Sequence, residues 1–156
     1  MSKVKVDFSD GFGKINEIAI KGTKVAADAL KEEVIKEISE GRSPVARVAR
    51  RFQRYSSSYR KAIDKGRYKN FNKRKRPVNL KLSGKLHDSI FSTPKGRNRV
   101  IIGFNNFLAD IHNRQGAGKS RTVRRMLPTK TGETFTNNIL IAVGNKLKKL
   151  ANQILR

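Results

Sequence analysis

The sequence contains no cysteine and is poor in histidine, methionine, proline and acidic residues. Without cysteine the chain has no disulfide, no thiolate metal site and no thiol nucleophile. Its two histidines, His87 and His112, have no partner residues at metal-ligand spacing, and we expect each to be structural. No apolar run approaches the ~18 residues of a membrane span, so no membrane partner is expected. Residues 1–8 lack the apolar core of a signal peptide, which favours a cytosolic or assembled intracellular protein.

Motifs for catalysis are also lacking. Residues 118–120 (GKS) match only the end of a phosphate-binding loop motif, because Asn113 stands where the motif has its first glycine. The residues before it predict a helix, whereas the motif follows a strand. The sequence therefore predicts no enzyme activity, catalytic residue, metal or cofactor. A phosphate-loop hydrolase is a rival interpretation, which nucleotide binding dependent on Lys119 would support.

Positive charge is abundant. Lysine and arginine number 36 against 12 acidic residues, a formal net charge of +24. Such an excess indicates a polyanion or an acidic partner surface.

The charge is densest in residues 42–76, which contain 14 basic residues and one acid, Asp64. Tyr55, Tyr59, Tyr68 and Phe71 are interleaved, as on a nucleic-acid surface. Basic side chains lying over core aromatics would give the same pattern. An acidic protein neighbour and a merely solvated surface are further alternatives. The residues expected to contact DNA or an acidic partner are Arg47, Arg50, Arg51, Arg54, Arg60, Lys73, Arg74, Lys75 and Arg76.

Helical periodicity dominates the first half of the chain. Apolar residues at spacings of three and four predict a helix over residues 12–40, which Gly41 ends, with the charges of residues 31–37 facing outward. Ser43 and Pro44 predict the start of a second helix reaching about residue 52. Residues 55–63 predict either one or two further helical turns or an ordered crossing segment.

The central stretch, residues 77–91, predicts an extended piece that runs into a short helix. Leu80 and Leu82 alternate with polar residues, and Ser83 is a candidate helix cap. Leu86 and Ile90 would then share one helical face.

The second half predicts a hairpin, a short helix and a final helix. Residues 89–93 and 99–104 flank turn residues, with residues 100–102 covered on both faces. Residues 107–112 predict a short helix. A last helix begins after Gly132, with Glu133 in its first turn.

We therefore predict a single α+β domain over residues 1–156. Long N-terminal and C-terminal helices pack on a small antiparallel sheet, with short helices and a basic extended loop. Residues 1–9 form an arm, residues 64–79 the basic loop, and residues 113–126 a glycine- and arginine-rich loop. The loop residues expected at a subunit or partner interface are Arg114, Lys119, Arg121, Arg124 and Arg125.

Three stretches resemble the virion-morphogenesis or tail-completion proteins of tailed bacteriophages, which sit at the neck between head and tail. They are residues 80–90 (LKLSGKLHDSI), residues 100–112 (VIIGFNNFLADIH), and residues 124–128 (RRMLP) followed by 132–135 (GETF). Residues 41–45 (GRSPV) and 55–59 (YSSSY) are similar to further family features. The matched structural positions are Leu82, Gly84, Leu86, Ser89, Ile111, His112, Leu127 and Pro128.

This resemblance implies a structural virion protein that assembles as a homo-oligomeric ring. The ring would complete the tail or the head–tail connector and join head to tail. Its partners would be head-completion or portal-side proteins and tail terminator or tail-tube proteins, with duplex DNA in the channel as a further, non-specific partner. Its location would be the virion neck, and the host cytoplasm during assembly. The alternative is a free basic nucleic-acid-binding protein of ribosomal or nucleoid type.

Overall fold

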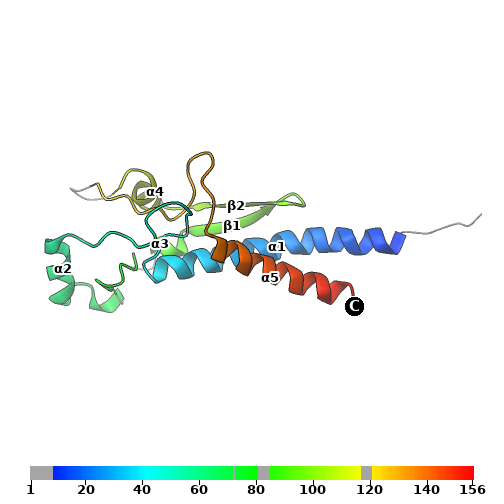
Figure 1. The fold of residues 1–156 in the computed structure, drawn as a ribbon. Coiled ribbons are helices and arrows are strands. Elements are labelled where there is room, and N and C mark those ends of the chain that lie inside the picture. The colour runs from blue at the N-terminus through cyan, green and yellow to red at the C-terminus, as the bar shows by residue number, and fades with distance from the viewer. Residues whose placement is uncertain (1–8, 72, 81–84, 117–120) are drawn as a thin grey trace, which may run out of the picture.

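The computed structural model describes residues 9–71, 73–80, 85–116 and 121–156, and it has the predicted α+β architecture (Figure 1). Helix α1 (Ser9–Ser39) runs through the middle of the molecule. Helix α5 (Asn137–Ile154) lies antiparallel to α1 on one side, and a β-hairpin packs on the other. The first and last helices are therefore neighbours although they are far apart in sequence.

The long first helix follows its apolar periodicity. Ala27, Val34 and Ile38 share one face of the helix and are buried, and both α5 and the hairpin contact α1. Gly41 ends the helix with a φ of 74°, a left-handed conformation that glycine adopts without strain. A Cβ atom on Gly41 would also lie 2.7 Å from the Cβ of Pro77. The predicted helix and its glycine terminus are both confirmed.

The hairpin consists of β1 (Ile90–Lys95) and β2 (Arg99–Phe104), which pair antiparallel with Ile90 opposite Phe104. Thr23 on α1 donates a hydrogen bond to the backbone oxygen of Arg97 at 2.7 Å, which ties the turn to the helix. The hairpin prediction is confirmed. The expectation that residues 100–102 are covered on both faces is wrong, because Ile101 is 40% exposed.

Short helices fill the connections. They are α2 (Ser57–Asp64), the 3₁₀ helix η1 (Lys69–Phe71), α3 (Lys85–Asp88) and α4 (Phe107–Arg114). Ser56 caps α2 by accepting a hydrogen bond from the Tyr59 amide, and Asn106 caps α4 by accepting one from the Leu108 amide. The helices predicted over residues 55–63 and 107–112 are confirmed.

The helix predicted after Ser43 and Pro44 is wrong. Val45 instead forms a β-bridge with Phe135, and the Arg47 φ of 61° lies outside the helical region. The Ser43 hydroxyl accepts from the Val45 amide at 3.2 Å and donates to the Arg125 oxygen at 2.7 Å. Tertiary backbone bonding has overridden a local helix signal here.

Two element boundaries also differ from the prediction. Ile90 begins strand β1 instead of sharing a helical face with Leu86. Leu80, predicted to be extended, is buried but has a φ of 48°, which is not an extended conformation. Helix α5 starts at Asn137, so Glu133 precedes it. The Glu133 carboxylate accepts instead from the Thr129 amide at 2.7 Å and the Lys130 amide at 3.1 Å, which closes a turn.

The core draws on regular and irregular segments alike. Helices and strand β1 contribute Val34, Ile38, Ile90 and Ile139. The connecting segments contribute Phe52, Val78, Leu80, Met126 and Leu127. More than half of this buried apolar cluster thus comes from residues outside the helices and strands, which fixes the connecting segments in place.

Candidate polyanion-binding surface

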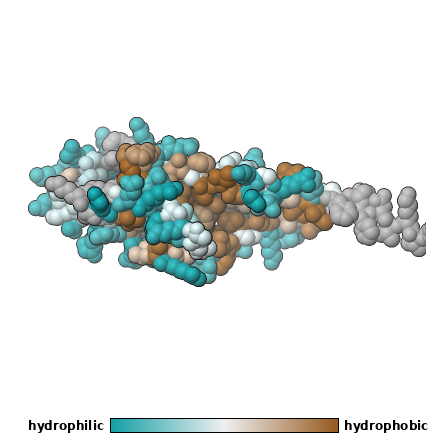
Figure 2. Space-filling view, turned by 90° about the horizontal axis from the view of Figure 1, so that it is seen from above, coloured by the Kyte–Doolittle hydropathy of each residue, from teal (hydrophilic) through white to brown (hydrophobic). Residues whose placement is uncertain are grey.

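The predicted basic contact residues divide into an exposed set and a half-buried set. Seven are exposed: Arg47, Arg50, Arg51, Arg54, Arg74, Lys75 and Arg76. Arg60 and Lys73 are half-buried. Figure 2 shows hydrophilic residues over most of the end that carries α2, whereas hydrophobic residues gather along the middle of the molecule.

One part of the basic surface is already paired within the chain. Glu37, which we expected to face outward, is only 5% exposed. It accepts two hydrogen bonds from the Arg42 guanidinium at 2.7 and 2.9 Å, and Arg50 lies 3.6 Å away. The hydrogen bond from Arg42 outweighs burial and holds the pKa of the Glu37 carboxyl below its usual range. Arg42 and Arg50 therefore form structural ion pairs with Glu37.

A second group of cations is stacked on aromatic rings. We call Tyr55, Tyr59, Tyr68, Lys73 and Arg124 the tyrosine cluster. The ring centroids of Tyr55 and Tyr59 are 5.0 Å apart, and those of Tyr59 and Tyr68 are 5.2 Å apart. The Lys73 ammonium lies 4.7 Å from the Tyr55 centroid and 5.8 Å from that of Tyr59. The Arg124 guanidinium carbon lies 5.3 Å from the Tyr55 centroid. These are cation–π distances.

Three segments of the chain bring the cluster together. Helix α2 places Tyr59 beside Tyr55, which precedes it, and the turns after α2 return Tyr68 to the same side. Arg124 arrives from far along the chain: its amide donates to the His112 oxygen at 2.8 Å, and its side chain donates to the Gln53 oxygen at 3.4 Å. The sequence allowed two interpretations of the interleaved aromatics: a nucleic-acid surface, or cations lying over half-buried rings. The second interpretation describes Lys73 and Arg124.

The electrostatics of the cluster follow from its burial. Burial, reinforced by the charge of Arg124, lowers the pKa of the Lys73 ammonium from 10.5 to about 8. Burial raises the pKa of Tyr59 to about 12 and that of Tyr55 further. Burial and the charges of Arg124 and Lys73 lower the pKa of His112, so its imidazole is neutral at pH 7. The cluster thus places two mutually repelling cations, Lys73 and Arg124, beside a neutral histidine.

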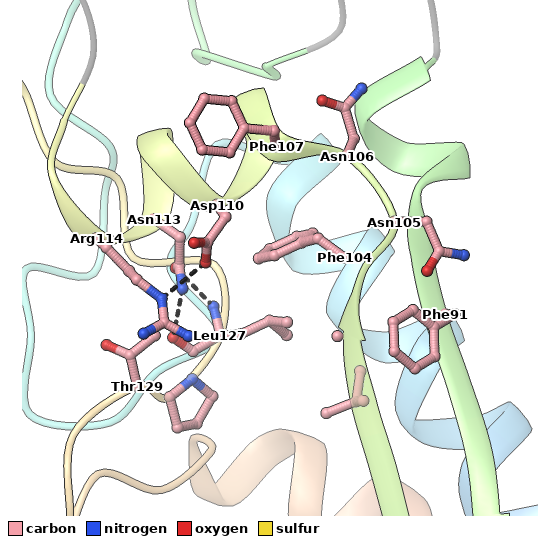
Figure 3. Close-up of a pocket in the computed structure, with 13 residues that line it drawn as sticks. Phe91, Phe104, Asn105, Asn106, Phe107, Asp110, Asn113, Arg114, Leu127 and Thr129 are labelled. Atoms are coloured by element: carbon pink, nitrogen blue, oxygen red, sulfur yellow. Dashed lines mark hydrogen bonds and ion pairs between the residues drawn. The ribbon is translucent and has the colours of Figure 1, made fainter.

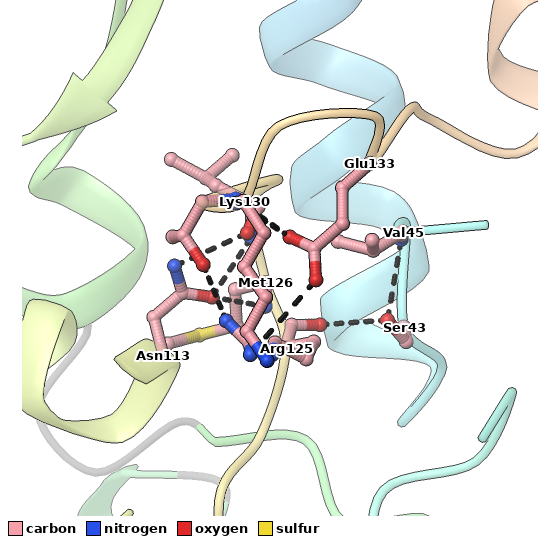
Figure 4. Close-up of polar contacts among 9 residues, drawn as sticks. Ser43, Val45, Asn113, Arg125, Met126, Lys130 and Glu133 are labelled. Carbon is pink, nitrogen blue, oxygen red and sulfur yellow. Dashed lines mark hydrogen bonds and ion pairs between the residues drawn. The ribbon is translucent and has the colours of Figure 1, made fainter. Parts of the chain in front are cut away.

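A buried amide holds the segment that carries Arg124 (Figure 4). The Asn113 side chain, 1% exposed, accepts from the amides of Met126 at 2.6 Å and Leu127 at 3.0 Å. It also donates to the Leu127 oxygen at 3.2 Å. The sequence signal for this role was weak, since an asparagine after a helix usually indicates a turn.

The predicted loop of residues 113–126 is therefore partly wrong. Asn113 and Arg114 belong to α4, and Arg124 is only 6% exposed, so it is not a surface contact. Arg125 is mostly covered and donates to the Thr129 hydroxyl, with Glu133 at 3.9 Å. Arg114 and Arg121 are exposed, and their contact with a subunit or partner stays a prediction. Lys119 lies outside the described residues.

The residues matched to the phage family occupy packed positions where they are described. Ser89 is buried, and its hydroxyl donates to the Leu86 oxygen at 2.7 Å. Leu127 is buried, whereas Leu86, Ile111, His112 and Pro128 are half-buried. His87, the other histidine, is buried, with its Nε2 3.1 Å from the Asn79 oxygen. Leu82, Gly84 and the candidate cap Ser83 lie outside the described residues, as does most of the predicted arm.

A cavity of about 530 Å³ lies between α4 and the hairpin (Figure 3). Its apolar lining includes Phe91, Phe104 and Phe107, and an ion pair between Asp110 and Arg114 at 2.7 Å borders it. Phe107 is 75% exposed. The sequence did not predict this cavity, because its lining comes from four segments that only the fold brings together.

Within the described residues, no cluster of three or more histidine, aspartate or glutamate side chains is suited to a metal ion. None of the described helices combines the length and apolarity required to cross a bilayer. Comparison with protein-family models, with curated proteins and with solved structures finds no match to this chain.

Proposed function

We propose that this chain is a structural protein of a tailed-phage neck. It assembles as a homo-oligomeric ring that completes the tail or the head–tail connector and joins head to tail around the DNA channel. The observation that carries the proposal is the order of the three family-like stretches, 80–90, 100–112 and 124–135, in one chain with a large positive charge. No catalytic role is part of the proposal.

The packing of these stretches supports it. Residues of the second and third stretches lie beside each other, because the His112 oxygen accepts from the Arg124 amide. Asn113, directly after the second stretch, binds Met126 and Leu127 of the third. Ser89, in the first stretch, accepts from the Asn105 amide in the second at 2.8 Å through its backbone oxygen. A shared motif order is easier to understand if the motifs form one packed unit.

The charge distribution supports the DNA channel as well. The exposed arginines 47, 51, 54, 74 and 76 take part in no ion pair among the described residues. Contacts to phosphate carry no base information, which suits a wall that any DNA sequence must pass.

Deletion of the gene from the phage that encodes it tests the proposal. We expect filled heads and complete tails to accumulate unjoined in negative-stain images, and the gene supplied in trans to restore joined particles. Mass spectrometry of purified virions should detect the chain. Joined, infectious particles made without the gene would refute the proposal.

The alternative is a free nucleic-acid-binding protein, which the basic run and its tyrosines favour. It predicts tight, non-specific binding by a monomer, with a log–log salt slope of about 0.9 for each phosphate neutralised on duplex DNA. Sedimentation of the free chain and of its complex with unrelated duplexes separates the two functions. A monomer that binds at physiological salt and is absent from virions would establish the alternative.

A further inference from the structure

The tyrosine cluster contains two cations and no anion to balance them. Arg124 is 6% exposed, and its Nε is buried without a hydrogen-bond acceptor among the described residues. Lys73, half-buried, faces the same Tyr55 ring. Placing a charge in a partly desolvated site is unfavourable unless a counter-charge or strong acceptors are present. Aromatic faces supply only part of that compensation.

The carboxylates nearest in sequence are occupied elsewhere. Asp64 pairs with Lys75 at 2.5 Å, and Asp110 pairs with Arg114 at 2.7 Å. Glu133 lies 3.9 Å from Arg125. Among the described residues no carboxylate comes within ion-pair distance of Lys73 or Arg124. The histidine beside them does not help, because the Nδ1 of His112 is buried without a partner in this part of the chain.

We propose that Lys73 and Arg124 form a binding site for one phosphate group of a nucleic-acid strand. The phosphate reaches Lys73 first, because this residue is half-buried whereas Arg124 is buried, and Arg124 contributes the second charge. Tyr59 and Tyr68, both half-buried, present rings on which an adjoining base packs. The site belongs to the single chain and does not depend on assembly into a virion.

Its surroundings favour phosphate over an isolated carboxylate. Arg67 is exposed, and its guanidinium carbon lies 5.8 Å from the Tyr68 centroid. Arg74 and Arg76 are also exposed and follow Lys73 within three positions of the sequence. A strand brings its negative charges at regular spacing, so one phosphate at the cluster leaves its neighbours near these arginines. A single acidic side chain would leave them unmatched.

The chain carries its own reporter for this site. It has three tyrosines and no tryptophan, and all three tyrosines belong to the cluster. Intrinsic fluorescence therefore reports on the cluster alone. Tripolyphosphate is a suitable first probe because it does not absorb where tyrosine is excited. We expect a saturable change in emission on titration, and poly-glutamate at equal charge concentration should bind more weakly.

Lys73→Met keeps the aliphatic stem and removes the charge. It should weaken tripolyphosphate binding by about tenfold or more, as expected when a charged hydrogen bond is lost. Lys69→Met makes the same change in net charge at an exposed position and should stay within about twofold of wild type. Lys73→Arg should retain binding. Circular dichroism melts of all three variants establish that they are folded.

The same variants are then titrated with a fluorescently labelled single-stranded oligonucleotide at several salt concentrations. Lys73→Met should lower the log–log salt slope by roughly 0.7, the contribution of one phosphate on a single strand. Equal affinities for the Lys73→Met and Lys69→Met proteins would overturn the proposal. So would poly-glutamate binding as tightly as tripolyphosphate, which would identify an acidic protein as the occupant. Neither result bears on whether the chain joins heads to tails.

Discussion

Lys73 should make the stability of the protein depend on pH between the pKa of its ammonium in the folded state and that in the unfolded state. Its pKa falls from 10.5 to about 8 on folding, so between these values the unfolded chain binds more protons than the folded one. The free energy of unfolding therefore rises with pH across this window. Below pH 8 the ammonium is charged in both states and the full cost of its burial is present.

The size of the effect follows from the same shift. At 1.36 kcal/mol per pKa unit, the change from 10.5 to about 8 corresponds to roughly 3 kcal/mol. Solvent reaches part of the side chain, so we expect about half of this, ~1.5 kcal/mol, between pH 7 and pH 10. Above pH 10 the raised pKa values of Tyr55 and Tyr59 act in the opposite direction, because the unfolded tyrosines lose their protons first.

Urea unfolding followed by circular dichroism at pH 7, 8, 9 and 9.5, at one ionic strength, measures this dependence. The wild type should gain about 1 kcal/mol more than Lys73→Met between pH 7 and pH 9.5. Lys69→Met is the control for the general loss of positive charge, and it should follow the wild type. If the wild type and Lys73→Met rise in parallel, Lys73 does not titrate in a desolvated site and our account of the cluster is refuted.

Three further predictions concern the segments around the cluster. Gly116→Ala should destabilise the fold by about 2 kcal/mol or more, because φ is +81° and the new Cβ would lie 2.1 Å from the Arg121 oxygen. Gly66→Ala, with a φ of +76° and open space around it, should lower the free energy of unfolding by only about 1 kcal/mol. Equal melting temperatures for the Gly116→Ala and Gly66→Ala proteins would contradict the steric argument. Asn113→Ala leaves the buried amides of Met126 and Leu127 without their acceptor, so the free energy of unfolding in urea should fall by about 2–4 kcal/mol. The control Asn138→Ala, at an exposed position, should change it by less than about 0.5 kcal/mol. ATP and GTP should be neither bound stoichiometrically at residues 118–120 nor hydrolysed, so stoichiometric binding that Lys119→Ala abolishes would show a nucleotide site.

The long elements were predictable because their signals are periodic. Helices α1 and α5 carry apolar residues at spacings of three and four over many turns, and the hairpin is marked by turn residues between β-prone runs. Gly41 marks the end of α1 for a local reason, its left-handed φ. Such signals depend on neighbours in sequence, and so the sequence alone reveals them.

The connections could not be predicted because their structure depends on distant partners. Ser43 and Pro44 are a good helix start in isolation, yet Ser43 binds Arg125, 82 residues away, and Val45 bridges Phe135. Arg124 has the composition of a surface residue but is buried against Tyr55, 69 positions before it. The basic, aromatic composition of residues 42–76 indicated a cationic surface. That Lys73 and Arg124 both lie over the Tyr55 ring could be seen only from the fold.

The packing of α1 between α5 and the hairpin has a consequence for synthesis on the ribosome. About 100 residues separate the end of α1 at Ser39 from the start of α5 at Asn137. At a synthesis rate of ~5–20 residues per second, the ribosome needs on the order of ten seconds to make the residues between α1 and α5. Throughout this interval the face that contacts α5 stays uncovered in the nascent chain, where it is a target for chaperones and for aggregation. The final helix thus acts as the closing step of folding, and the pace of translation sets how long the chain is exposed before it.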